Sequence, residues 1–369
     1  MNIYRELEIK KNEKLIKDGF FNGDAGNGIF RGTKYPYVLG DYKNNFYPPI
    51  IEEALEYFEK NEIKWWNKDI NINQPATNTL SSQIACLNHL FFIRRSKFLS
   101  LYTLNFITNR KFIDLFTLDN DKYNKAYISF EVSSDKDHLN EISTNRGELN
   151  TSIDALFLAE DENHKKCMVV IEWKYTEEYY NNEDESIKIK NGVHKKGEER
   201  LNRYTSLITN SKQLKHKYSD YKSSVYFHGE LYQLTRQTLW AEQMIENKDD
   251  ESIKADDFLH LAVISNKNKS MLSSVYKISN MNLEDTWRNV LNDNSKFMII
   301  DNKKIIEALE TLLQLIEYDD IDYKKIVFDI ENPKPASSIL LHILRHAEKS
   351  KANIINELTD FLTYLKTRY

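Results

Sequence analysis

The chain has 369 residues, and its 51 basic and 56 acidic side chains give a formal net charge of −5 at pH 7. Hydrophobic residues make up 41% of the sequence, which contains only ten glycines and six prolines. This composition excludes intrinsic disorder as the main state, a collagen-like chain, and a protein that coats nucleic acid through bulk positive charge. The length allows two domains, or one domain with additions.

The number of cysteines and the length of the apolar segments indicate the cellular compartment of the protein. Cys86 and Cys167 are too far apart for a C-x-x-C metal knuckle and too few for a disulfide scaffold. The first residues are charged and lack the apolar core of a secretion signal, and no stretch approaches the roughly 18 apolar residues that cross a bilayer. We therefore expect a cytoplasmic protein without a membrane partner.

Six of the ten glycines lie in the first 40 residues and predict an irregular segment. No Gly-Lys-Ser/Thr follows at the spacing of a phosphate loop, which favours a structural arm or lid over a phosphate cradle. Apolar residues at helical spacing then predict three helical runs: 50–60, from Thr79 onward, and 98–113. Ser81 or Thr79 is the candidate N-cap of the second run.

The apolar pattern changes after residue 125. Segments rich in β-branched and aromatic residues predict four strands: 126–132, 152–158, 167–175 and 258–264. A helix is expected over 230–247, and the C-terminal part is helical, with a break at 332–335. The order of helices, three strands, a helix and a strand indicates an α/β core with helical additions.

Two of these predicted strands carry charged side chains within otherwise apolar sequence. Asp154 lies in one, and Glu172 and Lys174 lie in the next. Side chains alternate along a strand, so Glu172 and Lys174 project from one face, and pairing of the strands as a hairpin brings Asp154 toward Glu172. A buried carboxylate is costly without a partner or a metal, and hard oxygen ligands bind Mg²⁺. Two such acids beside an ammonium group suit phosphodiester hydrolysis. In that reaction the lysine can position the nucleophile, deprotonate it, or offset the charge of the transition state.

The alternative interpretation is a surface hairpin with an ordinary Glu/Lys pair two residues apart. The apolar residues on both sides of Asp154 and of Glu172 disfavour it, because an exposed hairpin would alternate polar and apolar positions.

Asp154, followed eighteen residues later by Glu172-Trp173-Lys174, resembles the motif of the PD-(D/E)xK nuclease superfamily, and the expected element order resembles its core. Ile153 stands where the motif has Pro. Four segments resemble, more narrowly, a bacterial family of restriction-endonuclease-like proteins: Ser-Ser-Gln at 81–83, Thr-Ser-Ile-Asp at 151–154, Glu-Trp-Lys-Tyr at 172–175 and Tyr-Gln-Leu-Thr-Arg-Gln at 232–237.

The resemblance implies an α/β, restriction-endonuclease-like core at 75–270, consisting of a helix, a three-strand meander, a helix and a strand. An N-terminal Gly-rich arm and helix at 1–74 and a mainly helical C-terminal region at 271–369 would flank it. It implies a nuclease that cuts DNA in restriction or genome defence. Asp154 and Glu172 would bind Mg²⁺, for which Mn²⁺ substitutes, and Lys174 would assist the attacking water. A homodimer is compatible with this class of enzyme, although no surface in the sequence identifies an interface.

Further acidic and amide residues are candidates to support the site. The superfamily often adds an acid upstream of the aspartate, for which Glu131 is the first candidate and Glu148 the second; the alternative for Glu131 is an exposed strand residue. Gln233 and Gln237 lie one turn apart on the predicted helix, with Arg236 beside them. This helix either lends polar groups to the site or presents a solvated face.

A basic segment follows the predicted strands. Residues 186–223 hold ten basic and three acidic residues, with three tyrosines interleaved. Such a segment suits contact with DNA phosphates, although a solvated face is the common alternative. The residues that we expect to contact DNA are Lys195, Lys196, Arg200 and Arg203. His342 and His346 share a helical face, but Ile343 replaces the Glu of the zinc-protease pattern.

The sequence therefore predicts a Mg²⁺-dependent deoxyribonuclease, and two other classes stay open. One is a non-catalytic DNA-binding module with the same fold. The other is a structural or interaction protein in which Asp154 and Glu172 belong to a buried ion-pair network.

Overall fold

The computed structural model describes residues 3–67, 73–118, 126–141, 150–177, 194–215, 225–318 and 351–369. Its internal contacts divide the chain into two compact units, both discontinuous in sequence. Unit 1 consists of Met1–Glu6, Phe130–Leu156 and Lys165–Ile300. Unit 2 consists of Leu7–Ser129, Phe157–His164 and Asp301–Tyr369. The division at residues 74 and 270 that the resemblance implies stays a prediction.

The main sheet has six strands: β3 (Phe112–Phe116), β4 (Ser129–Val132), β5 (Ile153–Asp161), β6 (Lys166–Lys174), β7 (Asp257–Ile264) and β8 (Phe297–Ile300). The strand order is β3-β5-β6-β7-β8, and β4 pairs with β5. The β6–β7 and β7–β8 pairs are parallel, whereas β3 is antiparallel to β5, so the sheet is mixed. With the helices described below, this makes the fold α/β, as predicted.

The four predicted strands are confirmed as β4 to β7, with ends shifted by up to three residues. Residues 167–171 and 258–264 are buried throughout, as expected of strands in the middle of a sheet that is covered on both faces. In the parallel pair, Val170 lies opposite His260, and Glu172 lies opposite Ala262. Side chains at paired positions project from the same face, so this register fixes which groups of β7 lie beside Glu172.

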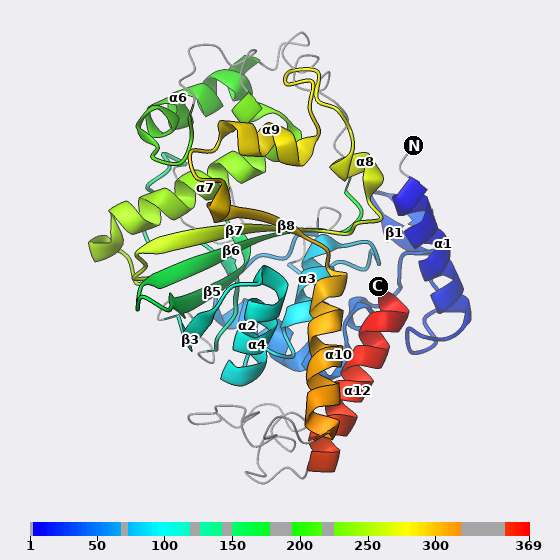
Figure 1. Cartoon of the computed structure of the whole chain (residues 1–369). Helices are drawn as coiled ribbons and strands as arrows, with labels where there is room; N and C mark the ends of the chain where they lie inside the picture. Colours follow the sequence, from blue (N-terminus) through cyan, green and yellow to red (C-terminus); the bar gives the residue numbers. More distant parts are fainter. Residues whose placement is uncertain are drawn as a thin grey trace. The chain divides into compact units, whose positions relative to one another are not determined.

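Unit 1 contains the helices α6 (His194–Asn210), α7 (Gly229–Glu246), α8 (Lys269–Leu272) and α9 (Leu283–Val290). The predicted helix at 230–247 is α7, and it packs against β6 and β7 (Figure 1). Leu231, Leu234 and Thr238 recur on one side of α7 and are buried, which is the spacing of a helix that packs on a sheet.

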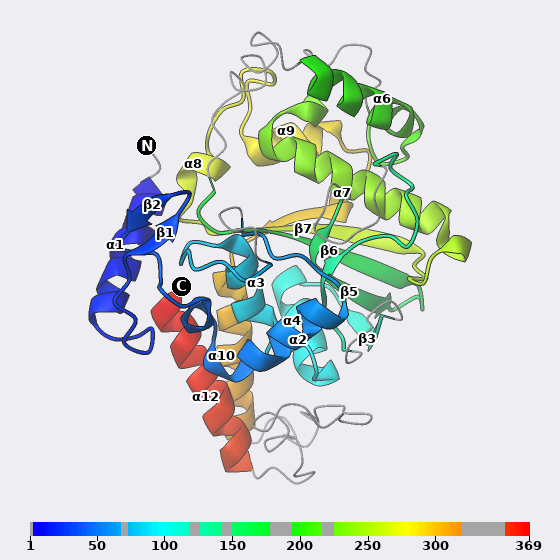
Figure 2. The same cartoon turned by 180° about the vertical axis from the view of Figure 1, so that it is seen from behind.

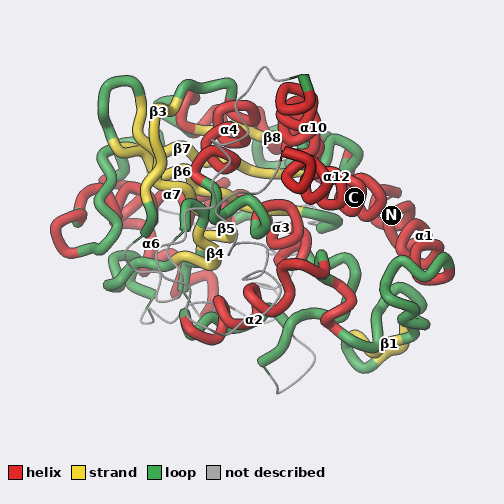
Figure 3. Tube along the Cα trace, turned by 90° about the horizontal axis from the view of Figure 1, so that it is seen from below, coloured by secondary structure: helices red, strands yellow, loops and turns green. Residues whose placement is uncertain are grey.

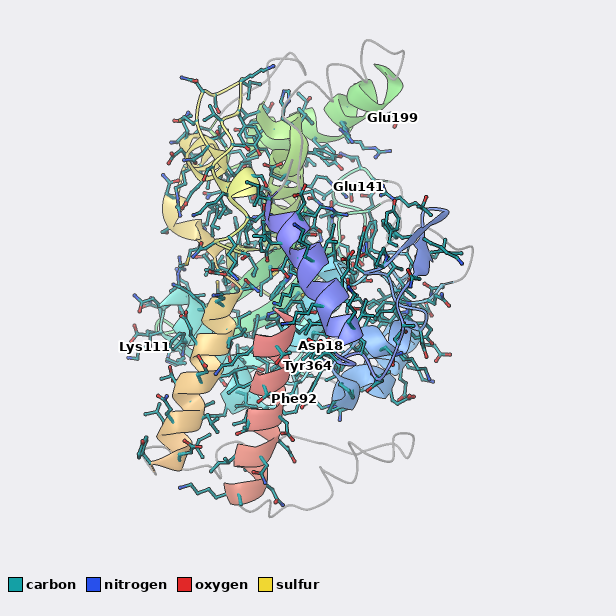
Figure 4. All side chains as sticks on the ribbon, turned by 90° about the vertical axis from the view of Figure 1, so that its right-hand side faces the viewer. Asp18, Phe92, Lys111, Glu141, Glu199 and Tyr364 are labelled. Carbon is teal, nitrogen blue, oxygen red and sulfur yellow. The ribbon has the colours of Figure 1, made fainter. Side chains whose placement is uncertain are left out.

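The other helices are α1 (Ile3–Lys17), α2 (Ile51–Lys60), α3 (Ser82–Leu90), α4 (Lys97–Thr108), α10 (Lys303–Glu317) and α12 (Lys351–Arg368). In unit 2, α10 packs against α4 and α12 (Figures 2 and 3). An aromatic cluster of the same unit joins Tyr47 to Phe361 and Tyr364 of α12, and Phe92 also contacts Phe361 (Figure 4). The predicted helix at 50–60 and the helical C-terminal region are confirmed within the described residues, whereas the predicted break at 332–335 lies outside them.

Five short 3₁₀ turns lie in the described part of the chain: η1 (Tyr42–Asn45), η2 (Pro48–Ile50), η4 (Val225–Phe227), η5 (Lys248–Asp250) and η6 (Asn294–Lys296). A two-stranded hairpin, β1 (Gly28–Phe30) and β2 (Thr33–Tyr35), follows the irregular Gly-rich segment. At Gly26, a Cβ would lie 2.3 Å from the Pro36 carbonyl oxygen, and φ is +67°, so only glycine fits there. None of the helices in the described part of the chain is long and apolar enough to cross a bilayer.

One predicted boundary is confirmed, and one is wrong. The Ser81 hydroxyl accepts a hydrogen bond from the Ile84 N–H and caps α3, as predicted. The helical run expected to reach residue 113 ends at Thr108, because Asn109 adopts the left-handed conformation with φ of 50°. The apolar residues from Phe112 onward therefore form β3, not the end of a helix.

The guanidinium of Arg368 is fully buried in unit 2. It donates hydrogen bonds to the side-chain oxygen of Asn12, to Asn45 Oδ1 at 3.0 Å and to the carbonyl oxygen of Thr79 at 2.8 Å. Charged donors make stronger hydrogen bonds than neutral ones, and a buried acceptor that loses its donor is left desolvated. This residue therefore links α12 to three separate segments of unit 2.

We expect Arg368→Met to lower the free energy of unfolding by about 3 kcal/mol or more, because three buried acceptors lose their donor. Lys366→Met on the same helix is the matched control. Lys366 is half exposed and pairs with Glu310, so its loss should change stability by less than about 1 kcal/mol. Urea unfolding measures both changes, and equal effects of the two variants would contradict this assignment.

Candidate active site

The three predicted catalytic residues come together in unit 1. Asp154 lies at the start of β5, and Glu172 and Lys174 lie at the end of the neighbouring strand β6. The backbone N–H of Trp173 donates to Asp154 Oδ2 at 2.7 Å, which fixes the aspartate against β6. Lys174 Nζ lies 2.5 Å from Glu172 Oε1, and both side chains are buried. The predicted hairpin geometry thus places two carboxylates and one ammonium side by side.

The helix α7 supplies two amide side chains to the same place. Lys174 Nζ donates to Gln233 Oε1 at 2.5 Å, and Gln237 Nε2 donates to Glu172 Oε2. Two strand residues span about 6.6 Å, and four helical residues rise about 6 Å, so the two pairs match when the helix runs antiparallel to the strand. These two contacts are what the predicted supporting role of both glutamines would require. A solvated face, the alternative, is excluded for Gln237, which is buried.

Negative charge crowds the carboxyl of Asp154. Burial, followed by the charges of Glu172 and Glu131, raises its pKa well above its ordinary value. The nearby charge of Lys174 and the N–H of Trp173 act in the opposite direction but do not cancel the increase. Three acids with one lysine are short of positive charge, and a divalent cation would relieve that imbalance.

Glu131 is buried at 2% exposure, so the alternative of an exposed strand residue is wrong. Its carboxylate accepts a hydrogen bond from the Ser152 hydroxyl at 2.9 Å, two residues before Asp154. Its φ is 48°, a left-handed conformation that costs free energy for a residue other than glycine. Backbone strain of this kind clusters at functional sites, so the conformation supports a role for Glu131 in the site. Glu148, the second candidate, lies outside the described residues.

Glu230 is a residue that the sequence analysis missed. It lies one turn before Gln233 on α7 and is buried at 4% exposure, and its Oε2 has no hydrogen-bond partner among the described residues. Burial raises its pKa from 4.5 to about 7, against the opposing charge of Lys174. The signal in the sequence is the spacing of residues 230, 233 and 237, which places all three side chains on one face of the helix.

Glu141 fixes the start of β5 and is labelled in Figure 4. Its carboxylate accepts from the backbone N–H of Thr151 at 2.5 Å and from the Thr151 hydroxyl at 2.8 Å. The Tyr204 hydroxyl of α6 and the Arg236 guanidinium of α7 also bind it, at 2.5 Å and 3.1 Å. Arg236 therefore holds the structure around the site and is not directed at Asp154.

The expected DNA-contacting residues Lys195, Lys196, Arg200 and Arg203 lie on α6. The Arg200 guanidinium lies 4.3 Å from the centre of the Tyr232 ring of α7. Arg200 and Arg203 are both half-buried. The side chains of Lys195 and Lys196 lie outside the described residues, as do Lys188, Lys190, Lys217 and Lys222. Contact with DNA by this segment stays a prediction.

The site residues fit a magnesium ion by the chemistry of their donors. Within the described ranges, no group of three or more His, Cys, Asp and Glu side chains is arranged to hold a metal. Mg²⁺ does not require such a group, because it commonly binds one or two protein carboxylates and completes its shell with water and substrate phosphate. Asp154 and Glu172 would be that pair, and a cation would offset the effect of the burial and the neighbouring carboxylates that raise the pKa of Asp154. His342 and His346 lie outside the described residues.

Comparison with known families gives one match to this chain. The model of the family described as "Restriction Endonuclease associating with ARP" matches residues 8–323. The chain belongs to this family. The matched range contains every candidate site residue, and the family description supports a nuclease-like role. Comparisons with curated proteins and with solved structures give no match.

The raised pKa of Glu230 predicts how stability depends on pH. Between pH 4.5 and about 7 the carboxyl of Glu230 keeps a proton in the folded protein that it has released in the unfolded chain. The free energy of unfolding therefore falls as the pH rises through this window. The two pKa values correspond to a loss of up to about 3 kcal/mol, complete above pH 7. Glu230→Gln removes the ionisable group and should stabilise the protein at pH 8 relative to pH 5.

Urea unfolding in EDTA at the two pH values measures this difference. Glu246→Gln, at an exposed position of the same helix, is the control and should change stability equally little at both. A Glu230→Gln variant whose stability, relative to the wild type, is the same at pH 5 and pH 8 would show that the buried carboxyl titrates normally.

Proposed function

We propose that this family member is a metal-dependent nuclease of the PD-(D/E)xK type that hydrolyses phosphodiester bonds of DNA. The observation that carries the proposal is the convergence of Asp154 and Glu172 from two neighbouring strands, with Lys174 in contact with Glu172. Membership of a restriction-endonuclease family supports it independently. The α/β sheet with α7 across it also agrees with a restriction-endonuclease core.

Asp154 and Glu172 would hold Mg²⁺, for which Mn²⁺ substitutes. When bound, the ion supplies Lewis-acid stabilisation of charge on the phosphate and lowers the pKa of water. Glu131 would support the acidic pair through its hydrogen bond from Ser152. The contribution of the protein is to bring these acids together within a buried sheet, where their mutual repulsion favours a cation.

Lys174 would act on the attacking water and on the phosphate. Glu172 Oε1 and Gln233 Oε1 each lie 2.5 Å from its Nζ, and they keep the ammonium at the end of β6. An ammonium group held in this way can orient a water for attack and stabilise the negative charge that develops on the phosphate. The charge of Lys174 in turn acts on Glu230, where it opposes the rise in pKa that burial causes.

The basic face of α6 would bind the DNA backbone. Arg200 and Arg203 are its described cations, and Lys195 and Lys196 lie on the preceding turns. Phosphate contacts of this kind give affinity without sequence preference. We place the activity in the cytoplasm and in restriction or genome defence, and the family description makes ARP an expected partner.

The direct test is cleavage of plasmid DNA in the presence of Mg²⁺. The wild type should cut, EDTA should stop the reaction, and Lys174→Ala and Asp154→Asn should each lower the rate about 100- to 1,000-fold. Lys166→Ala is the matched control, because Lys166 lies at the opposite end of β6, and it should keep the wild-type rate.

The negative outcomes separate the alternatives. If the wild type leaves DNA intact with Mg²⁺ and with Mn²⁺ but retards it in a gel, the protein is a non-catalytic DNA-binding module. If it neither cuts nor binds DNA, and calorimetry detects no Mg²⁺ binding, Lys174 and Glu172 form a structural ion pair.

A further inference from the structure

A chain of buried hydrogen bonds continues from Glu172 into the interior of unit 1. Gln237 Nε2 donates to Glu172 Oε2, and Gln237 Oε1 lies 2.8 Å from His260 Nε2. His260 Nδ1 lies 3.3 Å from the Thr238 hydroxyl. All four side chains are at most 4% exposed, so each contact is isolated from solvent.

The direction of each hydrogen bond follows from the chemistry of the groups. An ionised carboxylate only accepts, so the amide of Gln237 must turn its NH₂ toward Glu172 and its oxygen toward His260. His260 Nε2 must then carry the proton and donate it to Gln237 Oε1. Nδ1 is left as an acceptor, which the Thr238 hydroxyl satisfies. The four residues thus form one chain of donors that ends on Glu172.

The surroundings of His260 hold the imidazole neutral. Burial lowers its pKa to about 4, although the charge of Glu172 opposes the decrease. The ring packs edge-on against Phe297 of β8, and aliphatic residues flank His260 on β7. A histidine at such a position costs desolvation, and within the described residues its two ring nitrogens contact Thr238 and Gln237 of α7.

We propose that His260 and Thr238 are positioning residues for the candidate metal ligand Glu172. By fixing the orientation of the Gln237 amide, they keep an N–H donor on Glu172 Oε2 and leave Oε1 turned toward Lys174. This inference rests on the proposed function, and it adds two residues that touch neither the substrate nor the metal. Without the contact from His260, the amide could rotate and present an oxygen to the carboxylate, which would repel it.

Groups that orient a metal ligand typically change metal affinity about 10- to 100-fold when they are removed. We therefore expect His260→Leu to weaken Mn²⁺ binding at least about 10-fold. His260→Gln keeps an amide nitrogen near the place of Nε2 and should stay within about threefold of the wild type. Binding is measured without DNA, from the loss of the free Mn²⁺ signal in electron paramagnetic resonance, so no catalytic turnover is needed.

A second pair of variants perturbs the fold less. Thr238→Val removes the hydroxyl that donates to Nδ1, whereas Thr238→Ser keeps it. We expect weaker Mn²⁺ binding for Val than for Ser. This pair decides the question if His260→Leu does not fold. Phe297→Leu is the packing control, because it loosens the ring contact without breaking a hydrogen bond, and it should bind Mn²⁺ as the wild type does.

The tautomer of His260 gives a further independent readout. Long-range ¹H–¹⁵N correlation spectra of histidine-labelled wild type should show the proton on Nε2, and a proton on Nδ1 would overturn the proposal. Wild-type Mn²⁺ affinity in folded His260→Leu, or equal weakening by Leu and Gln, would also overturn it.

The proposed nuclease activity can fail separately. If the wild type binds Mn²⁺ and the variants behave as expected but no DNA is cut, the nuclease assignment is wrong, and the positioning role stands. If the wild type binds no Mn²⁺, the positioning role falls as well.

Discussion

The mutual repulsion of three carboxylates is the constraint on which the candidate site depends. Burial, followed by the charges of Glu172 and Glu131, raises the pKa of Asp154, and the charge of Lys174 opposes this increase. At the short distances inside a protein such repulsion is weakly screened, so holding these acids together costs free energy unless positive charge offsets it. The excess of negative charge is therefore what a divalent cation would offset at the proposed metal site.

The architecture of unit 1 maintains this arrangement. The apolar strands β6 and β7 lie in the middle of the sheet, and α7 packs against them (Figure 1), with Gln233 beside Lys174 and Gln237 beside Glu172. The antiparallel register of α7 and β6 pairs Gln237 with Glu172 and Gln233 with Lys174. Glu141 holds the beginning of β5, and the strained backbone of Glu131 directs a further acid to the same place. The packing of the strands and α7 thus stabilises an arrangement of like charges that would otherwise move apart.

The sequence predicts the parts of this site that depend on local pattern. Strand alternation and apolar neighbours were sufficient to expect Asp154, Glu172 and Lys174 together. The expectation that the helix with Gln233 and Gln237 lies beside them came from the resemblance to the nuclease superfamily. The strand β3 was missed because its apolar residues continue the pattern of α4, and only the conformation of Asn109 separates the two.

Glu230 and His260 could not be assigned from the sequence because their partners depend on the register between elements far apart in the chain. His260 is a single polar residue in an apolar strand, a pattern that fits a satisfied core histidine equally well. The positioning role that we propose for His260 depends on Gln237, which lies between His260 and Glu172 in the structure. The left-handed backbone of Glu131 likewise has no local sequence signal.

The most direct measurement is a crystal of the protein soaked in Mn²⁺, with diffraction data collected at a wavelength where manganese scatters anomalously. We expect an anomalous peak within coordination distance of both Asp154 and Glu172, about 2 to 2.5 Å from their oxygens. A soaked crystal that diffracts well and shows no peak there, with Lys174 still seated on Glu172, would contradict the claim that these acids form a metal site.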